Sequence, residues 1–246
     1  MGYTPGHGAT AVAFMAARTL ERHAPALVPL LRPGLRVVDV GCGPGSITCG
    51  IAARVAPGEV TAVDAADPQV EEARRAAAEA GLGNVRALRA DAAALPLPDG
   101  AADVALVHAV AEHLQDPVAA LAEVRRVLVP GGAALVTSPD WGGFLLMPPD
   151  AGAETALTRY RELQTAQGGD VRAGRRLGGH MRSAGFGDVA VEARYEMHDP
   201  AAPIAGYLAD RLAREGDDAA AAALRAWGAR PDALFAQCWV DALGRA

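Results

Sequence analysis

The sequence predicts an α/β protein with a doubly wound, mostly parallel sheet of seven strands. Short runs of β-branched and apolar residues alternate with helical patterns through the first half of the chain, and the links between them are short. A glycine-rich turn joins the first of these strands to a helix. With 246 residues the chain can bury one sizeable core, so we expect a single domain over residues 1–246.

Two helical segments, residues 10–22 and 25–31, precede the first strand. Pro25 suits the first turn of the second segment, because a backbone N–H at that position has no partner within a helix. A turn at residues 32–34 then leads into the sheet.

Five strands are expected in the alternating region, each ended by a turn or a polar residue. They span residues 35–40, 59–63, 84–90, 102–107 and 133–137. Helices connect them at residues 46–55, 67–80 and 117–128. Asp67 is the predicted N-cap of the middle helix, and Gly81 is its stop signal.

The alternation ends near residue 138. We expect an irregular loop over residues 138–149, helices over 150–167 and 174–184, and a strand over 189–197. A helical insert at about residues 200–230 then precedes a closing strand at residues 233–243. No linker marks a second independent domain.

Composition narrows the possible partners. With 23 basic and 29 acidic residues the net charge is −6, which argues against a nucleic acid held by a broad basic surface. No run approaches the ~20 apolar residues of a membrane span, and the first residues lack the pattern of a secretion signal. The three cysteines show neither metal-ligand spacing nor a disulfide framework. We therefore expect a cytoplasmic protein without a metal site, and its oligomeric state stays open.

The turn after the first strand carries glycines 41, 43 and 45 and opens a helix. Such a turn brings backbone N–H groups close to a ligand, although G-x-G-x-G alone is equally compatible with a connection that binds nothing. A dinucleotide site prefers G-x-G-x-x-G, and a phosphate loop requires Lys-Ser or Lys-Thr, which this turn lacks. Asp39 adds negative charge just before the turn. A ligand with an ammonium or other cationic group therefore fits better than a pyrophosphate.

Acidic residues follow at the ends of the next two strands. Asp64 lies 19 residues after Gly45, where a carboxylate can accept hydrogen bonds from two ribose hydroxyls. Asp91 ends the third strand, where it can accept a hydrogen bond from an adenine amino group. His108 ends the fourth strand. The carboxyl ends of parallel strands share one edge of the sheet, so these side chains are expected to meet there.

Five segments in this order resemble the class I S-adenosylmethionine-dependent methyltransferases, most closely the small-molecule branch typified by ubiquinone and menaquinone biosynthesis. They are VVDVGCGPGS at 37–46, VTAVD at 60–64, ADAAALPLPDGAADVALVH at 90–108, EHLQDP at 112–117 and LAEVRRVLVPGG at 121–132. The resemblance covers residues 35–138. It implies a Rossmann-like methyltransferase fold, S-adenosylmethionine as the cofactor and a small-molecule acceptor. The helical insert at about residues 200–230 could shape a pocket lid, which favours a specialised metabolite as the acceptor.

The resemblance also implies roles for individual residues. Asp39, Gly41 and Gly43 should line the methionine end of the cofactor, and Gln69 should support its ribose or adenine pocket. The expected cofactor-binding residues are Asp39, Gly41, Cys42, Gly43, Gly45, Asp64, Ala65, Gln69, Asp91, Ala92 and His108. Residues 1–34 should form a helical lid, residues 35–138 the cofactor-binding core, and residues 139–246 the part that shapes the acceptor pocket.

Catalysis by methyl transfer from a sulfonium is an in-line displacement that depends mainly on positioning. If the nucleophile enters protonated, the residues considered as a general base are His7, His108, His113, Asp140 and His180, of which His108, Asp140 and His7 are preferred. Acceptor contacts are expected from Tyr3, His113, Trp141 and Arg175. His113 and Trp141 could instead pack in the core without contacting the acceptor. Arg175 could instead lie on a solvated helix surface.

Other activities are compatible with parts of this pattern. A protein that keeps the cofactor fold but acts as a cyclase or decarboxylase would carry the same cofactor motifs. A nicotinamide-dependent dehydrogenase would bind NAD instead. A methyltransferase acting on nucleic acid is disfavoured by the acidic balance and by the sequence His-Ala-Val-Ala after the fourth strand.

Overall fold

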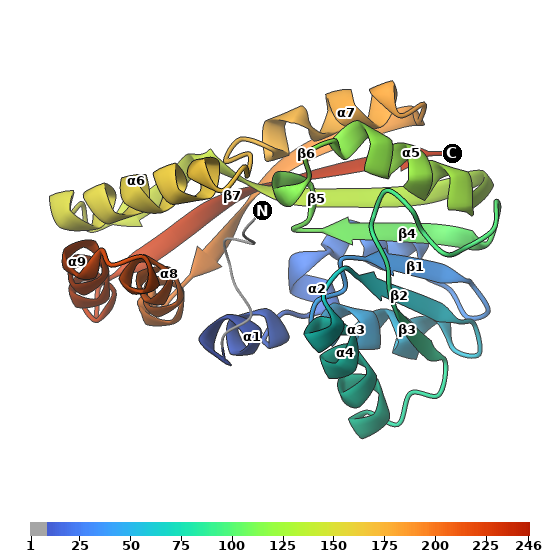
Figure 1. Ribbon diagram of the computed structural model, residues 1–246, viewed down its shortest axis with the longest axis horizontal. Helices are drawn as coiled ribbons and strands as arrows, with labels where there is room; N and C mark the ends of the chain where they lie inside the picture. Colours follow the sequence, from blue (N-terminus) through green and yellow to red (C-terminus); the bar gives the residue numbers. More distant parts are fainter. Residues whose placement is uncertain (1–8) are drawn as a thin grey trace.

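The strands form one sheet in the order β3-β2-β1-β4-β5-β7-β6 in the computed structural model, which describes residues 9–246 (Figure 1). Their bounds are Val37–Val40 (β1), Val60–Asp64 (β2), Val85–Arg89 (β3), Ala102–His108 (β4), Leu128–Met147 (β5), Gly187–His198 (β6) and Leu234–Arg245 (β7). The first five strands are parallel, and β7 lies antiparallel between β5 and β6. This confirms the predicted seven-stranded, mostly parallel sheet.

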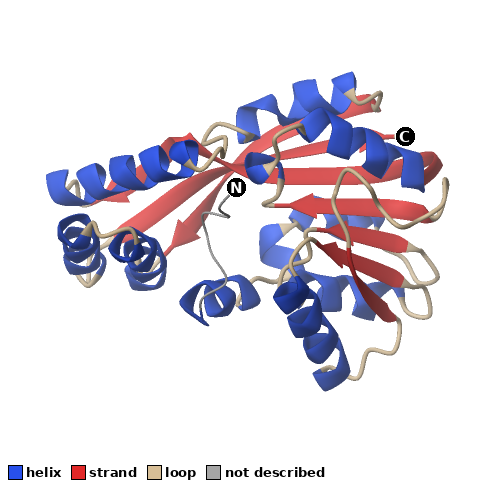
Figure 2. Ribbon diagram, in the orientation of Figure 1, coloured by secondary structure: helices blue, strands red, loops and turns tan. Residues whose placement is uncertain are grey.

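Helices cover both faces of the sheet (Figure 2). They are α1 (Ala9–Ala16), α2 (Leu20–His23), α3 (Ser46–Val55), α4 (Asp67–Glu79), α5 (Pro117–Val127), α6 (Ala151–Ala166), α7 (Leu177–Ser183), α8 (Ala202–Arg214) and α9 (Asp218–Gly228), with 3-10 turns η1 (Pro25–Leu30), η2 (Ala111–His113) and η3 (Gly174–Arg176). The predicted N-cap of α4 is wrong by one residue: Ala66 is the N-cap, and Asp67 is already helical.

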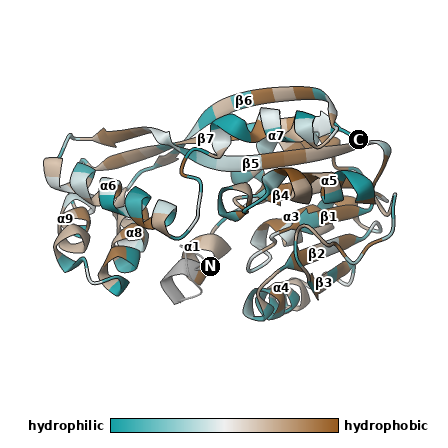
Figure 3. Ribbon diagram, turned by 45° about the horizontal axis from the view of Figure 1, so that its top comes forward, coloured by the Kyte–Doolittle hydropathy of each residue, from teal (hydrophilic) through white to brown (hydrophobic). Residues whose placement is uncertain are grey.

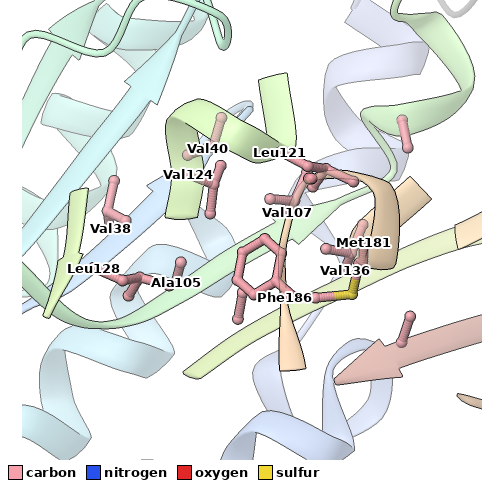
Figure 4. Packing of buried hydrophobic residues seen from close by; sticks show 14 of the residues in the cluster. Val38, Val40, Ala105, Val107, Leu121, Val124, Leu128, Val136, Met181 and Phe186 are labelled. Atoms are coloured by element: carbon pink, nitrogen blue, oxygen red, sulfur yellow. The ribbon is translucent and has the colours of Figure 1, made fainter. Parts of the chain in front are cut away.

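Alternation along β1 divides its side chains between two cores, because successive side chains of a strand point to opposite faces. Val38 and Val40 pack with α5 and α7, in the cluster that Figure 4 shows around Phe186 and Met181. Val37 packs on the other face with α3, where Ile51 and Val55 are buried. Both faces of β1 are thus covered, as a central parallel strand requires.

The predicted loop over residues 138–149 is wrong over most of its length, because β5 continues to Met147. Beyond Thr137, β5 keeps β7 as its partner after β4 has ended at His108. The register shifts between Asp140 and Phe144, where Gly142 and Gly143 lie. Pairing with a strand that lies 87 positions (Met147 with Leu234) to 102 positions (Ser138 with Val240) further along the chain, rather than any local signal, extends this strand.

The extension of β5, β6 and β7 carries the helical insert. Helices α6, α8 and α9 gather on one side of it (Figure 3) and share a core with Trp141 and Phe235. Of these, α8 and α9 form the insert expected before the last strand.

The N-terminal helical segment is broken rather than continuous over residues 10–22. The break lies between α1, which ends at Ala16, and α2, which begins at Leu20. Thr19 starts α2 as its N-cap, because its side chain accepts a hydrogen bond from the backbone N–H of Arg22. Helix α1 packs against α8, and α2 packs against α3. The N-terminal segment therefore connects the helical insert, through α8, to the helix that follows the glycine turn, α3.

No helix within residues 9–246 has both the length and the apolar character needed to cross a lipid bilayer.

Candidate cofactor and acceptor site

A cavity of about 350 Å³ lies at the carboxyl ends of β1, β2, β3 and β4. Its walls come from the glycine turn after β1, from residues 64–66 after β2, from residues 90–92 after β3 and from residues 108–110 after β4. Of the residues predicted to bind the cofactor, all except Gly45 line this cavity. Its size suits a small molecule, since ligand pockets occupy roughly 300–1,000 Å³.

Gly43 and Gly45 serve different purposes in the turn, although both have positive φ, 54° and 83°. A Cβ at Gly45 would lie 2.8 Å from Cα of Ala73, so this glycine lets α3 begin against α4. A Cβ at Gly43 would meet no described atom within 4 Å. Gly43 therefore borders open space in the cavity, whereas Gly45 packs against α4 and does not line the cavity.

Asp39 is buried at the base of the turn. The Thr48 hydroxyl on α3 donates a hydrogen bond of 2.6 Å to its Oδ2. Burial raises the pKa of Asp39 to about 6, against the lowering effect of the Thr48 hydrogen bond and with a smaller raising effect from the charge of Asp64. Asp39 is thus a carboxylate near neutral pH that a nearby cation would stabilise.

Asp64 connects the end of β2 to the glycine turn. Its Oδ2 accepts a hydrogen bond from the backbone nitrogen of Gly43 at 3.0 Å, and its Oδ1 accepts one from Ala66 at 2.9 Å. Each carboxylate oxygen has a further lone pair for a ligand hydroxyl. Asp91 is exposed at the next strand end, with its Oδ1 held by the backbone nitrogen of Ala93 at 2.8 Å.

His108 is buried at the end of β4, with its ring stacked on Trp239 at 5.0 Å between centroids. Burial lowers the pKa of His108 well below its ordinary value, and the charges of Arg18 and Arg194 lower it further. Its Nε2 has no hydrogen-bond partner among the described residues. A neutral ring in this setting suits contact with the cofactor better than uptake of a proton.

A second compartment of about 60 Å³ adjoins the first. The two share four lining residues, Met15, Arg18, Ala109 and His113. The remaining walls come from Phe14 in α1, Glu112 in η2, and residues of α6, α8, β5, β6 and β7. A small molecule in this compartment would therefore lie next to a ligand in the larger cavity.

Two predicted acceptor contacts, His113 and Trp141, line this second compartment. Burial lowers the pKa of His113, although Glu112, whose Oε1 lies 3.8 Å from His113 Nε2, acts in the opposite direction. Trp141 also packs on Tyr160 at 5.2 Å between ring centroids. Both residues thus combine packing with a place on the cavity wall.

Asp140 and Arg175 form a salt bridge instead of facing either compartment. The guanidinium Nε and Nη2 of Arg175 donate to the two carboxylate oxygens of Asp140 at 2.7 Å each. Burial would raise the pKa of Asp140, but the hydrogen bonds from Arg175 and from two backbone nitrogens outweigh it and lower the pKa. This geometry favours neither Asp140 as a base nor Arg175 as an acceptor contact, since each satisfies the other.

The predicted candidates Tyr3 and His7 lie outside the described residues. Residues outside the predicted set also line the site, namely Arg18, which follows α1, and residues of α6. Arg18 lines both compartments, and its guanidinium carbon lies 5.8 Å from the centre of the Trp239 ring. Gln164 and Tyr160 line the smaller compartment from α6. For Arg18 the available signal is its place within the expected lid helix of residues 10–22. The α6 residues carry no such signal, because only tertiary packing brings α6 to the site.

A family profile described as "Methyltransferase domain" matches residues 38–136. The chain is 38% identical over 161 residues to an uncharacterized 37.1 kDa protein in a transposon of Streptomyces fradiae, covering 63% of this chain and 44% of that protein. It is 37% identical over 131 residues to nocamycin O-methyltransferase of Saccharothrix syringae, covering 53% and 44%. With demethylmenaquinone methyltransferase of Thermus thermophilus it shares 39% identity over 115 residues, covering 46% and 52%. The matches thus span about half the length of these curated relatives.

Solved structures extend the similarity to almost the whole chain. The [4+2]-cyclase SpnF superposes with a TM-score of 0.56 at 25% identity, covering 94% of this chain and 80% of that one. An S-adenosylmethionine-dependent methyltransferase from Aquifex aeolicus superposes with a TM-score of 0.54 at 20% identity, covering 91% of each chain, which shows the shared fold. Residues 38–136 thus carry a methyltransferase domain, and the described chain has the fold of S-adenosylmethionine-dependent methyltransferases.

Proposed function

We propose that this protein binds S-adenosylmethionine in the larger cavity and transfers its methyl group to a small-molecule acceptor in the adjoining compartment. The observation that carries the proposal is the meeting of Asp39, Asp64 and Asp91 with the glycine turn around one cavity. The family match and the methyltransferase relatives support it.

The residues fit the parts of this cofactor. Its ammonium group suits Asp39, because a nearby cation stabilises the ionised form of this buried carboxylate. Its ribose hydroxyls can donate hydrogen bonds to the remaining lone pairs of Asp64. Gly43 leaves room beside the turn. Arg18 is the one permanently charged cation lining the cavity within residues 9–246, and it suits the cofactor's carboxylate. The single arginine and the three acids fit a diphosphate poorly.

The bound cofactor supplies an electrophilic methyl group on a sulfonium. The chain's contribution is to hold the two compartments side by side, so that an acceptor can approach in line with the breaking carbon–sulfur bond. Such positioning can account for roughly 7–11 kcal/mol of the barrier. For a protonated acceptor, His113, which lines both compartments, would receive the proton, and Glu112, whose Oε1 lies 3.8 Å from His113 Nε2, would stabilise the resulting imidazolium. A general base of this kind accelerates the reaction by roughly 10²–10⁴-fold.

The N-terminal residues to position 34 serve as the lid in this proposal, and residues 139–246 shape the acceptor side. Met15 and Arg18 line both compartments, and the Ser46 hydroxyl at the start of α3 donates to the backbone oxygen of Met15 at 3.2 Å. The lid is thereby tied to the glycine turn region.

The test is a binding titration followed by a transfer assay. Calorimetry should show S-adenosylmethionine and S-adenosylhomocysteine binding at one site, with NAD without effect. A panel of small metabolites incubated with isotope-labelled methyl donor should then give labelled product and S-adenosylhomocysteine in equal amounts. Binding of NAD in place of S-adenosylmethionine would contradict the proposal.

A cyclase-type activity is the second candidate, because the SpnF structure covers 94% of this chain at 25% identity. The two activities differ in stoichiometry. Product formation that requires the bound cofactor, yet releases no S-adenosylhomocysteine, would favour the cyclase over the transferase.

A further inference from the structure

Strand β6 forms one edge of the sheet, and β7 is its only strand partner within residues 9–246 (Figure 3). The carbonyl oxygen of Met197 points away from β7, because it accepts a hydrogen bond from the side chain of Arg22. That of Val189 does so as well, with Arg182 as its donor. Backbone groups alternate between the two sides of a strand, so the N–H and C=O groups of residues 191, 193 and 195 also point outward. The middle of β6 thus presents a free backbone edge, which is a template for another strand.

The same part of β6 carries apolar side chains that lie in the open. Val191, Tyr195 and Met197 are exposed by 46%, 51% and 44%. Val191 is paired with Ala242 on β7, so these side chains share the face of the sheet on which α5 and α7 pack nearer the core. Helices α6, α8 and α9 pack on the opposite face of the strand extension. An exposed strand edge with apolar side chains is a feature that folded proteins usually cover.

The sequence of β6 is complementary to itself when a second copy pairs with it antiparallel, with Ala193 opposite Ala193. In that register Val191 lies opposite Tyr195 of the second copy, and Val189 lies opposite Met197. Pairs of an aromatic and a β-branched side chain directly across two strands are stabilising. All of these residues have odd numbers, so the free backbone groups of the two strands also meet.

Charged side chains on the other face of β6 favour the same register. Glu192, which is exposed, would lie opposite Arg194 of the second copy, so a two-fold pair of strands forms two such contacts. Arg194 uses two of its five donors for Asp241 and for the backbone oxygen of His23, which leaves others for a carboxylate. Moving the centre by one residue would instead place Glu192 opposite Glu192 or Arg194 opposite Arg194. Like charges directly opposite each other are destabilising.

We propose that two copies of this protein associate through β6, antiparallel and centred on Ala193, so that their sheets join into one continuous sheet. The contact is isologous, since the same strand serves on both sides of a two-fold axis. It also brings the exposed Tyr195 of one copy next to Val191 of the other, which α7 flanks: a Cβ at Gly178 would lie 2.6 Å from Val191 Cγ2. The inference is independent of the proposed function.

Sedimentation velocity over a dilution series tests whether the pair forms. The mass of the wild-type chain should rise with concentration from 25.2 kDa to twice that value. A mass of one chain at every concentration would overturn the proposal.

Two variants test whether β6 is the contact. Ala193→Pro removes the outward N–H at the centre, and proline is tolerated on an edge strand where its missing N–H faces solvent. Glu192→Arg places like charges opposite each other and leaves the backbone unchanged. Each should raise the dissociation constant of the dimer at least tenfold, while circular dichroism and the affinity for S-adenosylhomocysteine stay as in wild type.

Glu79→Arg is the matched control, because Glu79 is an exposed glutamate on α4, which packs on β2 and β3 at the other end of the sheet. Its dissociation constant should equal that of wild type. A dimer that persists unchanged in Glu192→Arg, or that weakens equally in Glu79→Arg, is held by another surface, and the proposal is then wrong.

Cross-linking tests the register. In the proposed pair the two Cα atoms at position 193 are about 5.5 Å apart, a distance that a disulfide can span. The two Cα atoms at position 190 are roughly 20 Å apart, because six residues separate them along the strands. Mild oxidation should therefore yield a covalent dimer from Ala193→Cys but not from Ala190→Cys, with the wild-type chain and its three free cysteines as the background. No covalent dimer from Ala193→Cys, or equal amounts from both variants, would contradict the register.

Discussion

The Asp64 carboxylate accepts a hydrogen bond from the backbone nitrogen of Gly43 at 3.0 Å, and so joins the end of the second strand to the glycine turn after the first. The two residues are 21 positions apart in the chain. One side chain therefore shapes the turn and also presents its remaining lone pairs to the cavity. The arrangement makes cofactor binding sensitive to Asp64 in two ways.

Asp64→Ala should weaken S-adenosylmethionine binding at least tenfold, because it removes the ribose contact and releases Gly43. A charged hydrogen bond contributes about 1.5–3 kcal/mol, which corresponds to a factor of ten or more. Calorimetry measures the affinity, and circular dichroism checks that the fold persists. Asp67→Ala is the control, since Asp67 lies nearby but pairs with Arg89 on the exposed surface. Equal affinity of Asp64→Ala and wild type would refute the ribose assignment.

Cofactor affinity should fall as the pH drops through about 6, because burial raises the pKa of Asp39 to about 6. The ammonium group of the cofactor favours the ionised carboxylate, so below this pH a proton must leave before binding. One such proton lowers the affinity by up to about tenfold for each pH unit below the pKa. Above pH 7 the carboxylate is already ionised, and the affinity should be constant.

Asp39→Asn tests the origin of that pH dependence. The amide oxygen can still accept the hydrogen bond from Thr48, so the turn should keep its shape. The variant should bind the cofactor more weakly at pH 7.5 and lose the decline between pH 7 and pH 5. A variant that declines as steeply as wild type would assign the pH dependence to another group.

Gly45→Ala and Gly43→Ala should separate packing from binding within one turn. A Cβ at Gly45 would lie 2.8 Å from Cα of Ala73, at a φ of 83°, so a loss of about 2–4 kcal/mol in the free energy of unfolding is expected. At Gly43 only the backbone strain of about 1–2 kcal/mol applies, but the added methyl group reduces the space for the cofactor. Urea titrations and calorimetry measure the two effects. The prediction fails if Gly43→Ala is the less stable of the two.

Arg175→Ala should destabilise the protein by about 3 kcal/mol, because it leaves the buried carboxylate of Asp140 without its guanidinium partner. Cofactor affinity should be unchanged, since neither residue lines the cavity. Arg176→Ala provides the comparison: its partner Asp170 is partly exposed, so a loss below about 1 kcal/mol is expected. Equal losses in the two variants would show that the Asp140–Arg175 pair is no more stabilising than a surface pair.

Sequence patterns were sufficient to predict the cofactor half of this protein. The strands that end at Val40, Asp64 and His108 carry local signals, namely β-branched runs closed by glycine or by a polar residue. Once those strands are taken as parallel, their carboxyl ends must share one edge of the sheet. The positions of Asp39, Asp64 and Asp91 around one cavity then follow without knowledge of any side-chain contact.

The half of the chain that we propose to hold the acceptor was decided only by the tertiary structure. β5 extends to Met147 because β7 pairs with it from far along the chain, and that pairing turns an expected loop into strand. Asp140 is a carboxylate that could act as a base, but its oxygen accepts a hydrogen bond from the guanidinium of Arg175, which pairs with its charge. Gln164 and Trp239 come together from α6 and β7 across 75 positions of the chain. Such relationships depend on which distant segments pack together, and no periodicity or spacing within a short stretch of sequence encodes them.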